Sequence, residues 1–253
     1  MKDSTIKKVF HLNHLYFFIG ILLIIFIWFF VSIGVNNNIV VPTISDVTLK
    51  VINILTTVKY LKIILLTILK LILIIACSAV IGYILAVISF VSKEFKYIFR
   101  PIISLIRTLP IATVIVILLI YVGMNNTPIY ICAFVIVPII YEQVLVSFEE
   151  IDKNIIEETK MVCSVNIRVI TGVYLPITFP YFISSIFTVV GLGLKVLVMA
   201  EVFSQGQNTI GGAIQTARSI LDTTSIFAWT IILLLIVLIF EMILRVISKK
   251  IIK

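Results

Sequence analysis

The chain has 253 residues, of which 61% are hydrophobic and only 13% are charged, and its formal net charge is +8. A soluble domain is roughly half apolar, so this composition excludes an ordinary soluble protein. The apolar residues come in runs of about 20 or more, which is the length that a helix needs to cross a bilayer. A membrane β-barrel would instead show short alternating segments. We therefore predict an all-α membrane protein.

The apolar runs predict about six transmembrane helices. Their ranges are 15–35, 63–91, 101–123, 128–147, 178–203 and 226–247. The first run follows a basic start, but it is too long for a signal peptide and no cleavage site follows it. The domain prediction is therefore an N-terminal tail of residues 1–14, a transmembrane domain of residues 15–247 and a C-terminal tail of residues 248–253.

Lys and Arg residues predict the orientation of these spans, because cytoplasmic loops carry an excess of them. Of those outside the spans, 12 fall in the tails and in the loops on the same side, and 4 fall on the opposite side. Both termini are therefore predicted to be cytoplasmic, as is the loop between the fourth and fifth spans. The basic residues flank the apolar runs and form no single basic face, so nucleic acid is not an expected partner.

The segment of residues 149–176, between the fourth and fifth spans, is charged and resembles a helix. Apolar residues recur with helical steps at 151, 155, 162, 165 and 169, and the other face is charged. Such a helix can lie on the lipid surface, pack on its own bundle or dock onto a partner protein. Lipid docking favours a basic face, whereas this face is mixed and net acidic, which favours a protein partner.

Leu175 and Pro176 close this segment. Proline suits the first turn of a helix, where a missing N–H breaks no hydrogen bond. It also disfavours helical backbone at the residue before it. We therefore predict a helix, a bend at Leu175 and a fixed return of the chain into the fifth span.

The same segment resembles the EAA loop of ATP-binding-cassette importer permeases, which reads Glu-Ala-Ala, a Gly six residues after the Glu, and Ile-x-Leu-Pro at its end. The matching positions here are Glu157, Glu158 and Thr159 for the triplet, Cys163 for the Gly, Val173 for the Ile, and Leu175 and Pro176. Cys163 departs from the pattern, because Gly permits a turn at positive φ that Cys adopts only with strain. Either the bend is milder here or it is displaced toward Asn166.

Three further stretches are similar to the nitrate, sulfonate, taurine and thiamine-precursor permease subfamily. Residues 101–123 resemble its third span, which runs from Arg-Thr-Leu-Pro to an aromatic-x-Gly ending. Residues 67–70 resemble its Ser-Leu-x-Arg, with Lys70 in the Arg place, and residues 191–218 resemble its fifth span and the following outer loop. The shared order and spacing of these motifs cover most of residues 40–247.

The resemblance implies a half-pore that pairs with a second permease copy, with a homodimer favoured and a heterodimer left open. Each copy would contact a cytoplasmic ABC ATPase subunit through a coupling helix in the EAA loop. A solute-binding protein outside the bacterial cell membrane would deliver a small anion or a thiamine-precursor-like compound. ATP and Mg would be used by the partner, and no cofactor or metal is expected on this chain. Consistently, residues 206–211 imitate a phosphate-binding loop but lack its Lys and Ser/Thr.

Four ionisable residues inside the predicted spans are candidates for the solute pathway or for bundle packing. Lys70 and Arg107 could tie the bundle together or line a cavity, and Arg107 lies near enough to the inner surface to snorkel. Lys195 could snorkel or pair with a neighbouring helix. Glu201 is expected at the outer interface, on a different helix face from Lys195. Gly191 and Gly193 would let another helix approach closely, which suits packing at a bundle or dimer interface.

Two other classes of function remain as alternatives. A secondary transporter would need coupling-ion carboxylates near the midplane, but Glu142, Glu201 and Glu241 fall toward span ends, where Glu142 and Glu241 are expected to be solvated or paired. A membrane enzyme would need clustered His, Asp or Glu or an activated nucleophile, and both histidines lie outside the spans. The sequence therefore favours a non-catalytic permease.

Overall fold

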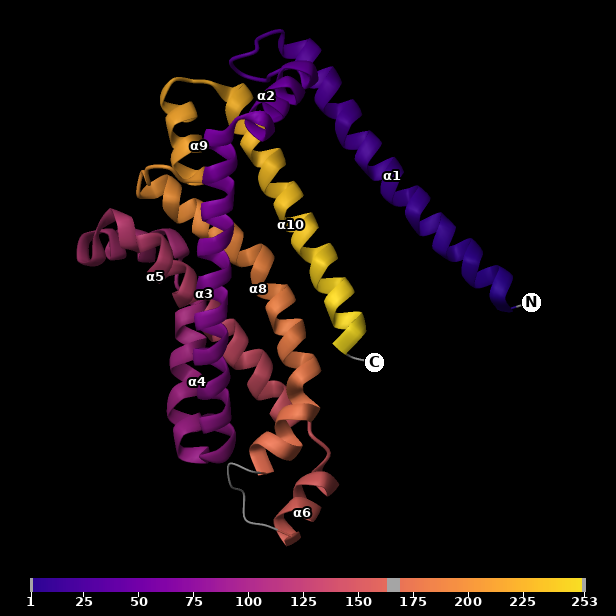
Figure 1. Cartoon of the computed structure of the whole chain (residues 1–253), viewed down its shortest axis with the longest axis vertical. Coiled ribbons are helices and arrows are strands. Elements are labelled where there is room, and N and C mark those ends of the chain that lie inside the picture. Colours follow the sequence, from indigo (N-terminus) through magenta and orange to yellow (C-terminus); the bar gives the residue numbers. More distant parts are fainter. Residues whose placement is uncertain (1, 163–168, 252–253) are drawn as a thin grey trace. The chain divides into compact units, whose positions relative to one another are not determined.

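The computed structural model describes residues 2–162 and 169–251, and within them every regular element is a helix. The elements are α1 (Lys2–Val35), α2 (Ile44–Thr56), α3 (Val58–Val91), α4 (Lys93–Thr108), α5 (Ile111–Glu149), α6 (Lys153–Val162), η1 (Ile170–Tyr174), α8 (Leu175–Phe203), α9 (Ile210–Ser219) and α10 (Thr223–Ile251) (Figure 1). They form two compact units. Unit 1 contains residues 1–57 and 216–232, and unit 2 contains residues 58–215 and 233–253.

Four helices are long and apolar enough to cross a membrane: Val58–Val91, Ile111–Glu149, Ile170–Phe203 and Thr223–Leu244. They contain the second, fourth and fifth predicted spans and residues 226–244 of the sixth. The first predicted span lies in α1, where Ile19–Val35 forms a shorter apolar helix. The prediction of an all-α membrane bundle is confirmed.

The third predicted span is wrong as one continuous helix. Residues 101–108 end α4, and Pro110 precedes the start of α5, with Leu109 in extended backbone at φ −66° and ψ 134°. Proline disfavours helical backbone at the residue before it, so the helix ends there. The remainder of this span belongs to α5, which is kinked at Gly123, where φ is 75°. The aromatic-x-Gly pattern therefore marks a kink inside a longer helix.

Unit 1 is held together by contacts between α1, the α1–α2 loop and the start of α10. The rings of Trp28 and Phe227 have centroids 5.5 Å apart, and Trp28 Nε1 donates a hydrogen bond to the Pro42 carbonyl at 3.1 Å. The hydroxyl of Thr223 donates to the Asn38 carbonyl at 2.9 Å. These bonds satisfy polar groups at the loop ends of helices that otherwise present apolar surface.

Asp222 caps the start of α10. Its carboxylate accepts hydrogen bonds from the amide and the hydroxyl of Ser225, and Lys50 Nζ lies 3.6 Å away. Burial by itself raises the pKa of the Asp222 carboxyl, but the Ser225 hydrogen bonds and the Lys50 charge outweigh it, so the pKa lies below its ordinary value. The cap therefore stabilises the fold above the pKa of the unfolded carboxyl, and this contribution is lost as the pH falls through the lower folded pKa.

The Asp222→Asn variant separates the charge from the cap, because Asn is also a good N-cap residue. We expect the wild type to be the more stable of the two at pH 7, and the difference to shrink as the pH is lowered through about 4 toward 3. Thermal unfolding followed by circular dichroism would measure it. The Asp222→Ala control should lose about 1 kcal/mol at pH 7. A wild-type advantage that is constant from pH 7 to pH 3 would contradict the role of the charge.

Unit 2 is built on α3, α5 and α8. Its apolar core includes Ile115 and Ile131 of α5 with Val196 and Ala200 of α8. Gly193 of α8 faces α5 so closely that a Cβ atom there would lie 2.9 Å from Ile136 Cδ1. The predicted close helix approach at Gly193 is therefore confirmed within the chain itself.

Candidate functional site

The cytoplasmic segment predicted from the sequence contains a helix, α6 (Lys153–Val162), which Figure 1 shows at the end of unit 2 where α3 turns into α4. Glu157 and Glu158 are exposed on it, and the half-buried Thr159 donates its hydroxyl to the Ile155 carbonyl at 2.6 Å. Two acidic side chains of the predicted triplet therefore face outward, where a partner could reach them. Cys163 lies outside the described residues.

The predicted bend at Leu175 is wrong. Val173 belongs to the π-helix η1, and Leu175 continues it into α8 with helical dihedrals of φ −63° and ψ −47°. Pro176 is exposed in the first turn of α8, as predicted for a helix start, although α8 begins at Leu175 and not at residue 178. The Leu175 amide donates a hydrogen bond to the Ile170 carbonyl across the π turn. This bond holds Leu175 in helical backbone despite the extended preference of the residue before proline.

Tyr174, the last residue of η1, is fully buried in an aromatic cluster that the sequence analysis missed. Its ring centroid lies 5.3 Å from that of Phe90 on α3, and Phe90 stacks on Phe148 of α5 at 4.9 Å. Tyr83 of α3 and Phe182 of α8 extend the cluster, with centroids 5.4 Å apart. These five side chains are called the aromatic cluster below. Their only signal in the sequence is an aromatic residue directly before Leu175 and Pro176.

Ion pairs join α4 to the end of α5. Arg100 contacts Glu142 at 3.1 Å and Glu149 at 3.4 Å, and Lys96 also pairs with Glu149. The expectation that Glu142 is solvated or paired is confirmed. These pairs are partly exposed, so each contributes little by itself. As a network they fix the position of α4 against α5.

Lys70 and Glu201 meet, although they are 131 residues apart in the chain. Lys70 Nζ on α3 lies 3.2 Å from Glu201 Oε1 on α8. The Glu201 side chain has 0% of its surface exposed, and that of Lys70 has 29%. The sequence analysis did not predict the burial of Glu201, and its place at the outer interface stays a prediction. Lys70 ties α3 to α8, which is one of its two predicted roles. Lys195 is exposed on α8, and the prediction that it does not pair with Glu201 is confirmed.

The loop after α8 folds back over Glu201. The Gly211 amide donates to Glu201 Oε2 at 3.2 Å. A Cβ atom at position 211 would lie 2.4 Å from Glu201 Cβ and 2.6 Å from the Val198 carbonyl oxygen, so only glycine fits there. The glycines that imitate a phosphate-binding loop thus serve close packing, and both Glu201 carboxylate oxygens have a donor.

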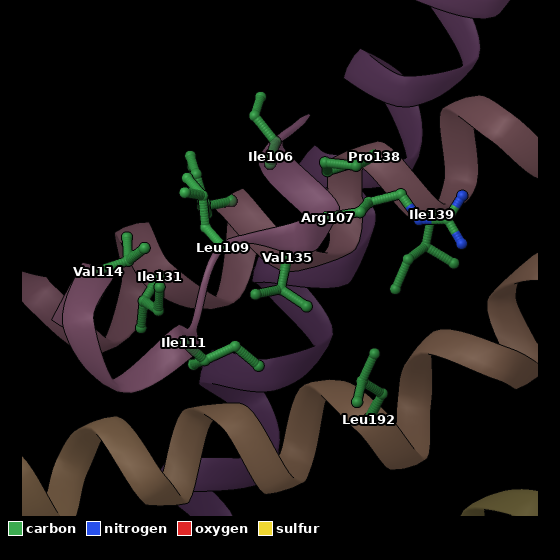
Figure 2. A pocket seen from close by; sticks show the side chains of 11 residues that line it. Ile106, Arg107, Leu109, Ile111, Val114, Ile131, Val135, Pro138, Ile139 and Leu192 are labelled. Carbon is green, nitrogen blue, oxygen red and sulfur yellow. The ribbon is translucent and has the colours of Figure 1, made fainter. Parts of the chain in front are cut away.

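Arg107, at the end of α4, is exposed and lines two cavities. The first has a volume of about 200 Å³ and is otherwise apolar, and Figure 2 shows Val114 and Ile131 at one end of it and the Arg107 guanidinium at the other. The second has a volume of about 420 Å³, and most of its lining residues carry a polar or charged group. It is lined by Lys96, Tyr97, Arg100, Pro101, Ser104, Arg107 and Glu142. Arg107 thus lines a cavity, which is one of its predicted roles.

Comparison with known protein families identifies the chain. The family described as "Binding-protein-dependent transport system inner membrane component" matches residues 78–253. The chain belongs to this family. It is therefore an inner-membrane permease, which confirms the importer-permease prediction at the level of the family and supports a transport role in place of an enzymatic one. No curated protein matches it.

The matched region of the permease contains Arg107, the α6 segment, the aromatic residue Tyr174 and Glu201, whereas Lys70 lies before it. One partner of the buried ion pair thus falls inside the matched region and the other outside it. The arrangement has no obvious covalent chemistry. It can present an exposed acidic helix to a partner, hold three long helices in fixed relation and offer a cationic side chain to a cavity.

Proposed function

We propose that the permease is the transmembrane subunit of an ATP-binding-cassette importer and that α6 is its contact with a cytoplasmic ATPase. The observation that carries this proposal is that an exposed acidic helix is followed, within the same segment of the chain, by a buried aromatic residue. Glu157 and Glu158 face outward on α6, while Tyr174, just before α8, is buried and contacts Phe90 of α3. A partner that moves α6 would therefore act on a segment that is packed into the bundle.

In this mechanism, two permease copies form the solute pathway, and a homodimer is favoured by the resemblance. ATP and Mg bound by the ATPase subunits would draw those subunits together and carry the two α6 helices with them. Pro176 would keep the start of α8 stiff, so that the movement reaches the fifth span. This mechanism requires α6 on the cytoplasmic side of the membrane. The Lys and Arg distribution supports that orientation, in which both termini are also cytoplasmic.

The solute belongs to the proposal and follows from the resemblance to the nitrate, sulfonate, taurine and thiamine-precursor permeases. A small anion or a thiamine-precursor-like compound would arrive from a solute-binding protein outside the membrane. Lys70 forms an ion pair with Glu201, so its charge is not available to an anionic solute. Of the predicted polar residues, Arg107 and Lys195 remain exposed for such a role.

Reversal of one charge on α6 tests the ATPase contact. We expect Glu157→Lys to reduce co-purification of the ATPase after mild detergent extraction by at least about tenfold. The reason is that a reversed charge at a docking surface, where it repels the partner's cation, costs about 1.4 kcal/mol or more. Glu94→Lys makes the same charge change at an exposed acid outside the segment, on α4, and should leave co-purification unchanged. Unchanged ATPase binding and unchanged transport in Glu157→Lys would remove the docking role.

A further inference from the structure

Arg107 has no carboxylate partner among the described residues. Two of the three other cations of α4, Lys96 and Arg100, are paired with Glu142 or Glu149. For Arg107, by contrast, no carboxylate lies within ion-pair distance among the residues that the structure describes. Arg107 lies at the end of α4, which is not among the helices long and apolar enough to cross a membrane. A guanidinium that lines two cavities and has no carboxylate partner among the described residues is a binding site for an anion from outside the chain.

The two cavities at Arg107 differ in chemistry, and this difference restricts the anion. The cavity of about 420 Å³ offers the hydroxyl of Ser104 beside Arg107, and its other charged residues, Lys96, Arg100 and Glu142, are already in ion pairs. The cavity of about 200 Å³ is lined by Arg107 and otherwise by apolar side chains such as Val114, Ile131 and Val135, which can solvate hydrocarbon but no second charge. A ligand that fills both must have an anionic head and an apolar tail.

The surroundings of α4 favour a lipid as the source of such a ligand. On the face of α4 away from the polar cavity, Ile98, Ile102 and Leu105 have 68%, 45% and 67% of their surface exposed. Exposed apolar side chains on a short helix with a basic opposite face are typical of contact with the bilayer interface. Arg also binds phosphate with two parallel hydrogen bonds, which suits a phospholipid headgroup.

We propose that the permease binds an anionic phospholipid, with the phosphate at Arg107 and Ser104 and part of one acyl chain in the apolar cavity. The lipid supplies the counter-charge that the chain lacks and fills the space beside α5 and α8 that protein side chains leave open. This site does not depend on α6 or on any ATPase, so it stands or falls separately from the proposed coupling.

The full-length permease in detergent is the material for the test, and native mass spectrometry would measure the lipid that it retains. The probes are phosphatidylglycerol and phosphatidylcholine with the same acyl chains. We expect preferential retention of phosphatidylglycerol and an approximately tenfold loss of it in Arg107→Gln, the scale of one charge-assisted hydrogen bond. Lys195→Gln is the matched control, because Lys195 is another exposed cation of a predicted span and lines neither cavity. It should retain the lipid as the wild type does.

A second variant tests the apolar cavity without changing charge. Val135→Phe should fill the cavity and weaken phosphatidylglycerol retention, with an unchanged unfolding temperature showing that the variant is folded. Equal retention of the two lipids, or equal losses in Arg107→Gln and Lys195→Gln, would overturn the proposal. Glycerol phosphate binding as tightly as the lipid would also overturn it, in favour of a soluble anion. Loss of a dimer in Arg107→Gln, with lipid retention unchanged, would overturn it in favour of a second copy of this chain.

Discussion

Glu201→Ala is expected to lower the unfolding temperature of the detergent-solubilised permease by about 10 °C. The substitution removes the partner of the Lys70 ammonium and of the Gly211 amide, both of which contact the Glu201 carboxylate at 3.2 Å. Leaving one member of a buried ion pair without its partner costs about 3–5 kcal/mol. Circular dichroism or a thiol-reactive dye would report the transition.

Two comparisons isolate the ion pair in that experiment. Lys195→Ala removes an exposed cation from the same helix, and its effect should stay within about 0.5 kcal/mol. The double variant Lys70→Met with Glu201→Gln removes both charges and leaves an acceptor for the Gly211 amide. Because replacing both partners of a buried pair is often nearly neutral, the double variant should be more stable than Glu201→Ala. Strictly additive losses from Lys70→Met and Glu201→Gln would show that the two charges do not interact.

The Lys70–Glu201 pair shows where sequence reasoning about this permease stops. Both residues could be selected from the sequence, because ionisable groups inside apolar runs are rare and costly. Their pairing could not, because it joins α3 to α8 across 131 residues and depends on how the helices pack. The burial of Glu201 also depends on Gly211, whose loop looked from the sequence like a failed phosphate cradle.

The positions of the long helices could be predicted from the sequence. The residues at which helices end were harder to predict, as two prolines show. Hydrophobic runs of sufficient length located α3, α5, α8 and α10, since a membrane leaves few other solutions for apolar backbone. Pro110 broke a run that is apolar on both sides, whereas Pro176 did not bend the chain before it. The preference of the residue before proline for extended backbone decided the conformation of Leu109 but not that of Leu175. At Leu175 the neighbouring π turn and the buried Tyr174 decided the backbone.

Tyr174→Leu is expected to abolish the nucleotide-dependent movement of α8 relative to α3 in a complex of the permease with its ATPase. Tyr174 contacts Phe90 of α3, and Phe90 stacks on Phe148 of α5. In the proposed coupling, a force from α6 would therefore reach these helices through the Tyr174 ring. Loss of a large buried ring also costs up to about 3–5 kcal/mol in stability. Leucine retains part of the apolar volume, so the variant should still fold and bind the ATPase.

Spin labels on the exposed Cys77 of α3 and at position 181 of α8, introduced by Tyr181→Cys, would measure that movement. Tyr174→Phe is the control, because it removes only a hydroxyl that has no hydrogen-bond partner among the described residues and keeps the ring contacts. It should preserve the ATP-dependent change in distance between the labels. A full distance change in Tyr174→Leu, with the ATPase bound, would mean that the motion of α6 bypasses the aromatic cluster. Loss of ATPase binding itself would instead count against α6 docking, so the two parts of the mechanism can fail separately.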